Sequence, residues 1–74
     1  MSRERQICFT DSGGKEIFSI PDGSFIKMVY GNGDEHFVLC RYLDEERAKI
    51  DGVDYSIREF AQRMERNGIS YAAV

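Results

Sequence analysis

Residues 24–43, with the sequence SFIKMVYGNGDEHFVLCRYL, decide the fold of this chain. Two runs rich in aromatic and β-branched residues flank a turn centred on Asn32 and Gly33, a residue pair typical of a type I′ hairpin turn. We therefore predict an antiparallel hairpin from residues 24–30 and 35–43, with Asn32 and Gly33 as its two loop residues.

A two-residue loop also fixes which residues of this hairpin lie opposite one another. It pairs Met28 with Phe37 and Ile26 with Leu39 on one face of the sheet. The opposite face then carries Phe25, Lys27, Val29, His36, Val38 and Cys40. Both faces are partly apolar, so each of them needs a cover.

Shorter elements are predicted on both sides of the hairpin. Residues 7–10 and 17–20 alternate like two further strands and are bounded by turns that contain glycine. Residues 44–47 form a charged, exposed link. Residues 49–55 predict a small hairpin that turns at Asp51-Gly52.

The spacing of apolar residues becomes helical near the C-terminus. Four of them recur at i, i+3, i+4 and i+7, which places them on one stripe of a helix: Ile57, Phe60, Ala61 and Met64. Ser56 and Glu59 have the spacing of a capping box at the start of this helix. Gly68 predicts a left-handed cap at its end.

This order of elements predicts a single α+β domain over residues 1–74. We expect an antiparallel β-meander of four to five strands with one C-terminal amphipathic helix packed on it. An SH3-like small barrel with a terminal helix is the alternative. A chain of 74 residues has room for one domain with a thin core.

Charge and cysteine content indicate a soluble protein of the cytoplasm. The formal net charge of −3 is modest and lacks the basic field that phosphate binding favours. Residues 1–6 are mostly charged or polar, and no apolar leader follows them. Cys8 and Cys40 lie far apart in the sequence and form no CxxC pair, so we expect both thiols to be reduced.

No pattern of residues predicts catalysis, a cofactor or a metal site. His36 is the only histidine, and Cys40 is too far along the same strand for direct activation of its thiol. The acidic run at residues 44–46 lacks the spacing of a calcium loop. We therefore expect a protein that is not an enzyme and that binds neither a metal nor a cofactor.

The apolar face opposite the helix suggests an interaction surface, because a contiguous exposed apolar patch usually marks an interface. Its predicted members are Phe25, Val29, Val38, Cys40 and Tyr42. A homodimer or docking on a larger partner would cover them. The N-terminal hairpin could instead curl over this face and close a barrel.

Nucleic-acid binding is the alternative function. Arg58, Arg63 and Arg66 lie on the outer part of the predicted helix and would carry the phosphate contacts. Neighbouring glutamates dilute this charge, which also suits an ordinary solvated helix surface. Membrane binding is not expected.

Three segments resemble a group of short uncharacterised proteins from gut Firmicutes (Clostridia). These segments are residues 40–45 (CRYLDE), 49–52 (KIDG) and 60–68 (FAQRMERNG), and the similarity extends to the first turn at residues 12–16. The resemblance implies a bacterial cytoplasm, often near mobile or conjugative elements, and no mechanism. Many of these proteins carry a histidine near position 56, where this chain has Ser56, so no role of that histidine carries over.

Overall fold

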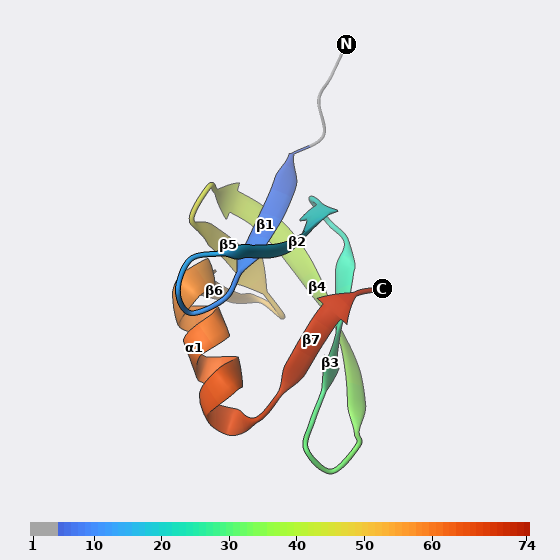
Figure 1. The fold of residues 1–74 in the computed structure, drawn as a ribbon. Helices are drawn as coiled ribbons and strands as arrows, with labels where there is room; N and C mark the ends of the chain where they lie inside the picture. The colour runs from blue at the N-terminus through green and yellow to red at the C-terminus, as the bar shows by residue number, and fades with distance from the viewer. Residues whose placement is uncertain (1–4) are drawn as a thin grey trace.

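A computed structural model describes residues 5–74 as an α+β fold, which confirms the predicted class (Figure 1). In chain order the elements are β1 (Gln6–Thr10), β2 (Glu16–Pro21), β3 (Phe25–Val29), β4 (Glu35–Asp44), β5 (Arg47–Ile50), β6 (Val53–Ser56), α1 (Ile57–Asn67) and β7 (Ser70–Ala73). A five-stranded antiparallel sheet has the order β6-β5-β4-β3-β7. Strands β1 and β2 form a separate antiparallel pair.

The β3–β4 hairpin closes through a three-residue loop instead of the predicted two-residue loop. The Tyr30 N–H donates to the Asp34 carbonyl and the Gly33 N–H donates to the Tyr30 carbonyl, each at 2.9 Å. Gly33 has a φ of 93°, whereas Asn32 does not have a positive φ. This is a type I turn followed by a left-handed glycine. The Asn32 side chain supports it by accepting a hydrogen bond from the Asp34 N–H at 3.0 Å.

The longer loop shifts the strand pairing by one residue, so the predicted register is wrong. Ile26 lies opposite Val38, and Phe25 lies opposite Leu39. Because successive side chains point to opposite faces of a sheet, the shift moves every side chain of β4 to the other face. Val38 therefore faces the core, and Phe37 faces outward.

The core lies between the inner face of the large sheet, helix α1 and the β1–β2 hairpin. Aromatic rings join these three parts: Phe9 of β1 lies 6.0 Å from Phe60 of α1, and Phe60 lies 5.1 Å from Tyr71 of β7, between ring centroids. Phe18 of β2 stacks on Phe9 at 4.9 Å. The N-terminal hairpin thus covers the same face of the sheet as the helix and leaves the outer face uncovered.

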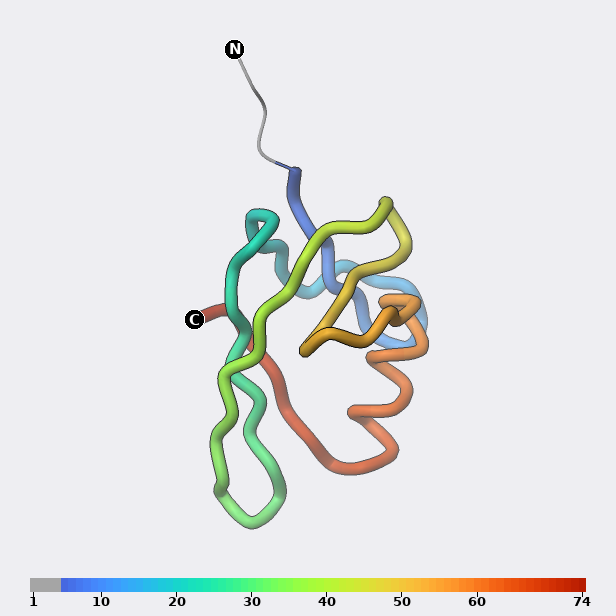
Figure 2. Tube along the Cα trace, turned by 180° about the vertical axis from the view of Figure 1, so that it is seen from behind, coloured from blue at the N-terminus to red at the C-terminus, as the bar shows by residue number. Residues whose placement is uncertain are grey.

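Strand β7 was not expected from the sequence. After α1 the chain returns to pair with β3, with Ile26 opposite Ala73 and Val29 opposite Ser70. Figure 2 shows this last segment running beside β3. Within residues 5–74, β6 and β7 stand at opposite edges of the open sheet, so the alternative of a closed SH3-like barrel does not form.

Helix α1 confirms the predicted apolar stripe and its C-cap. Its buried residues are Ile57, Phe60, Ala61 and Met64. Gly68 caps it with a φ of 68°. The predicted capping box is wrong, since the Ser56 side chain makes no capping hydrogen bond. Strand β6 runs directly into the helix, and the Ile57 N–H donates to the Glu46 carbonyl at 2.9 Å.

The predicted Asp51-Gly52 turn is confirmed. Asp51 and Gly52 have φ values of 54° and 80°, the two positive values that a type I′ turn requires. Strands β5 and β6 pair on either side of the turn, with Lys49 opposite Asp54. This small hairpin extends the sheet at the edge opposite to β7.

Candidate interaction surface

The five residues predicted to form an interface do not share one surface. Phe25 is 49% exposed on the outer face of the large sheet, and Val29 is half-buried on the same face. Val38 and Cys40 are buried on the inner face. Tyr42 is half-buried and packs against the core. The shift in register is the reason, because it exchanges the two faces of β4.

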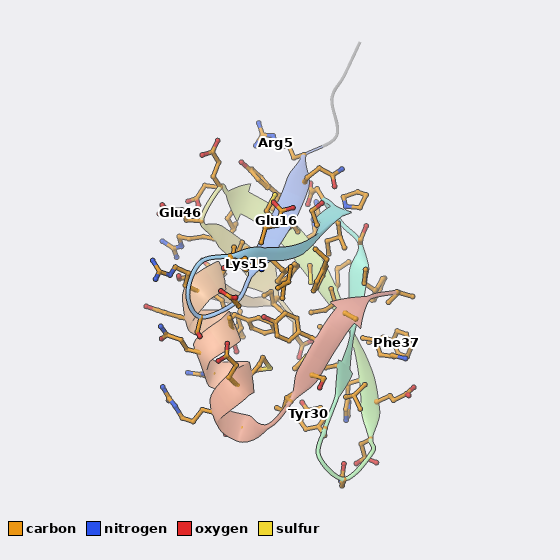
Figure 3. The ribbon with its side chains drawn as sticks, viewed as in Figure 1. Arg5, Lys15, Glu16, Tyr30, Phe37 and Glu46 are labelled. Atoms are coloured by element: carbon orange, nitrogen blue, oxygen red, sulfur yellow. The ribbon has the colours of Figure 1, made fainter. Side chains whose placement is uncertain are left out.

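Apolar side chains do gather on the outer face, in a different set. We define the outer apolar cluster as Phe25, Val29, Phe37 and Leu39. Phe25 lies directly opposite Leu39, and these two side chains are 49% and 39% exposed. Phe37, on the same face of β4, is 55% exposed and points away from α1 (Figure 3).

Neither helix α1 nor the β1–β2 hairpin packs on the outer apolar cluster. Helix α1 and the β1–β2 hairpin both lie on the inner face, where Phe9, Phe60 and Tyr71 hold them together. On the outer face, Lys27 of β3 lies between Phe37 of β4 and Ala72 of β7. Ala72 is a small apolar side chain on the edge strand of the sheet. The cluster itself spans β3 and β4.

Charged side chains lie at the border of the cluster and, in the case of Lys27, inside it opposite Phe37, in pairs of opposite sign. Lys27 Nζ lies 3.8 Å from a Glu35 carboxylate oxygen, and Lys49 Nζ lies 3.9 Å from one of Asp54. Arg41 Nε lies 3.4 Å from an Asp22 carboxylate oxygen in the same way. Exposed pairs of this kind contribute about 0–1 kcal/mol to stability. Their effect here is to leave the border without a strong field of either sign.

Cys8 and Cys40 are free thiols. Burial raises the pKa of Cys40 to about 11. Burial also raises the pKa of Cys8, and the Glu16 carboxylate adds to this rise. The His36 and Tyr30 rings form an edge-to-face pair, with 4.9 Å between centroids. Neither thiol has the low pKa of an activated nucleophile.

The three arginines of the nucleic-acid prediction are not brought to one place. Arg63 lies over the Tyr55 ring at 5.6 Å, and with Arg66 it borders a shallow depression beside the helix. Arg58 lies against Gly14, at a different hollow of the surface. Five residues of a helix turn through about 500°, which leaves Arg58 about 140° from Arg63 around the axis. Nucleic-acid binding stays a prediction.

Within the part of the chain that the structure describes, no helix is long and apolar enough to cross a membrane. The same residues contain no group of three or more His, Cys, Asp or Glu side chains placed to hold a metal ion. No protein-family model matches the chain, and comparison with curated proteins and with solved structures finds no match. The resemblance to short clostridial proteins stays a prediction.

Sequence reasoning missed Phe37 and Leu39 as surface residues because it assigned the wrong loop. A signal for the right loop is present in the sequence. Gly33 also fits the third position of a three-residue loop, where a left-handed residue follows a type I turn. Gly31 and Asn32 suit the two central positions of that turn.

Proposed function

We propose that this protein is a non-enzymatic protein-interaction module that binds through the outer apolar cluster. The observation that carries the proposal is that Phe25, Phe37 and Leu39 are exposed together on a face of the sheet that no described element covers. Contiguous apolar surface of this kind is costly to leave in water and usually marks a binding site. We place the module in the cytoplasm, since its two free cysteines suit a reducing compartment.

The size of the cluster fits a moderate affinity. Each half-exposed phenylalanine leaves about 100 Å² in water, and Leu39 and Val29 bring the cluster to about 300 Å². Two such clusters in contact would remove about 600 Å² of apolar surface from water, a gain of about 15 kcal/mol. Association itself costs about 4–15 kcal/mol. The difference between gain and cost is therefore about 0–11 kcal/mol. A micromolar dissociation constant corresponds to about 8 kcal/mol, which lies in this range.

A second copy of the chain is the occupant that the surface favours. The border charges are paired with opposite charges of the same molecule, so they attract neither a strongly acidic nor a strongly basic partner. Two copies related by a two-fold axis would each present the same apolar cluster to the other. Docking on a larger partner with a matching apolar surface is the other form of the proposal.

Light scattering over a concentration series tests the proposal. We expect a dimer whose population follows mass action. Phe37→Asp should abolish it, because it places two carboxylates in an apolar contact. The matched control is Ile17→Asp. Ile17 is 48% exposed, and it precedes the core-facing Phe18 in β2, so it lies away from the cluster.

The outcomes separate the two forms of the proposal. A wild type that stays monomeric up to about 1 mM would exclude self-association of useful strength. Capture of a bacterial protein by the wild type and by Ile17→Asp, but not by Phe37→Asp, would then establish docking on a larger partner. If Phe37→Asp retains every association of the wild type, the outer apolar cluster is not the binding surface.

A further inference from the structure

A second feature lies on the opposite side of the large sheet from the outer apolar cluster. A cavity of about 200 Å³ opens between α1 and the inner side of the β3–β4 hairpin. Its apolar part includes Met28 of β3 and Met64 of α1, which are 8% and 5% exposed. Drug-sized ligands occupy pockets of about 300–1,000 Å³, so this cavity suits a smaller group.

Aromatic side chains form much of the wall of this cavity. Tyr30 and His36 lie edge to face at the base of the hairpin loop, with 4.9 Å between ring centroids and 71° between ring planes. Tyr55 of β6 and Phe60 of α1 form a second edge-to-face pair, at 5.4 Å and 66°. Figure 3 shows Tyr30 on the side of the hairpin that is nearer α1. The faces of such rings carry partial negative charge and attract cations.

The charge of the lining has the same sign as the ring faces. Asp51 is the acidic residue of the lining, which contains no lysine or arginine. Within residues 5–74, this carboxylate makes no ion pair within 4.0 Å. The main chain holds Asp51 in place, since its N–H donates to the Leu39 carbonyl at 3.0 Å and its φ of 54° belongs to the type I′ turn.

One ring of the wall already contacts a cation outside the cavity. The Arg63 guanidinium lies over Tyr55 at 5.6 Å from the ring centroid, in the separate depression beside the helix. This guanidinium opposes a second cation by charge repulsion. Arg63 and Asp51 are both exposed, so water screens the repulsion by the one and the attraction by the other alike, and the ring faces supply the main attraction.

We propose that this cavity binds an organic cation, namely an ammonium group carried on an apolar chain. The apolar floor would take the chain, and the rings and the Asp51 carboxylate would take the charge. Two sources supply this chemistry: a free quaternary ammonium compound, or a lysine side chain presented by a protein. The proposal is independent of the outer apolar cluster, which lies on the other face of the sheet.

Methyl resonances of the methionines give a direct readout of binding. Met28 and Met64 line the cavity, and Met1 serves as the reference signal. The probe is choline, and 3,3-dimethyl-1-butanol is its neutral counterpart of the same shape. At pH 8, where histidine side chains are ordinarily uncharged, we expect choline to shift the Met28 and Met64 signals saturably. The neutral alcohol should bind about fivefold more weakly or worse.

Two variants test the parts of the cavity. Asp51→Asn removes the charge and keeps the turn, because asparagine accepts a left-handed conformation readily. It should weaken choline binding about two- to fivefold. Glu45→Gln is the matched control, since it changes the net charge equally at the distant β4–β5 turn. Tyr30→Leu should weaken choline more than it weakens the neutral alcohol.

A lysine-containing peptide and its trimethyl-lysine form distinguish the two sources. Tighter binding of either peptide than of choline would assign the site to a protein side chain, and the reverse order would assign it to a free ammonium compound. Equal affinity for choline and the neutral alcohol would overturn the proposal. Equal effects of Asp51→Asn and Glu45→Gln, or no shift of Met28 and Met64 with choline, would overturn it as well.

Discussion

Placing a carboxylate on each face of β4 tests the register from which the outer apolar cluster follows. Val38 and Phe37 are neighbours in the sequence, but Val38 is 8% exposed and Phe37 is 55% exposed. Val38→Asp therefore puts a charge into the core, whereas Phe37→Asp puts the same charge into water. The two-residue loop predicted from the sequence would have reversed these two outcomes.

The expected difference between the two variants is large. Loss of the buried valine costs about 2 kcal/mol, and burial of a carboxyl group without a partner adds about 3 kcal/mol or more. Val38→Asp should therefore lower the free energy of unfolding by about 5 kcal/mol. A 74-residue domain is stable by about 4–11 kcal/mol, so this variant is at the edge of unfolding. Phe37→Asp loses only partly buried ring surface and should cost about 2 kcal/mol.

Urea unfolding followed by far-ultraviolet circular dichroism measures both costs. The protein is kept at low micromolar concentration, so that loss of a dimer does not add to the cost of Phe37→Asp. The pH supplies a second readout. A buried carboxyl group has a folded-state pKa above its unfolded-state value, so its cost is smallest at acid pH and grows as the pH rises between those two values. The cost of Val38→Asp should be smaller at pH 4 than at pH 7.

The reasoning would be refuted by a larger cost for Phe37→Asp than for Val38→Asp. That result would restore the sequence-based register and remove Phe37 from the surface. Equal costs with no dependence on pH would mean that neither residue is buried. In that case the inner face of β4 would not belong to the core.

Two further predictions concern the helix cap and the thiols. Gly68→Ala should lower the free energy of unfolding in urea by about 1–2 kcal/mol, since the φ of 68° strains a residue with a Cβ although nothing lies within 4 Å. Gly31 lies in equally open space without a positive φ, so Gly31→Ala should cost little. Equal costs of the two variants would contradict this explanation. Disulfide-exchange labelling at pH 8 should reach Cys8 slowly and the buried Cys40 only after unfolding, because burial raises the pKa of both thiols. Glu16→Gln should speed the labelling of Cys8, since the Glu16 carboxylate contributes to its raised pKa, and an unchanged rate would count against that contribution.

Local signals of the sequence were enough for the helix and for the small hairpin. The stripe of α1 repeats every three or four residues, and Gly68 ends the helix at the expected place. Asp51-Gly52 forms the predicted turn because both residues tolerate a positive φ. In these elements the residues that interact are neighbours along the chain, so spacing alone determines them.

The candidate surface was predicted only in part, for a reason that lies in one loop. Phe25 and Val29 belong to the outer apolar cluster as expected, but Phe37 and Leu39 replace Val38 and Cys40. The loop sequence suits both a two-residue turn and a three-residue turn, and the local difference between them is small. Burial of Val38 beneath the helix favours the second, and this contribution comes from residues far along the chain.

The sequence by itself thus determined the class of the fold, the helix and its stripe, and the positions of the turns. The tertiary structure alone decided the register of β3 and β4, the pairing of β7 with β3 and the side of the sheet that the N-terminal hairpin covers. It also decided the cavity, whose wall joins Tyr30 to Tyr55 across the core. These features depend on contacts between distant segments, and their free energy appears only when the whole core is buried.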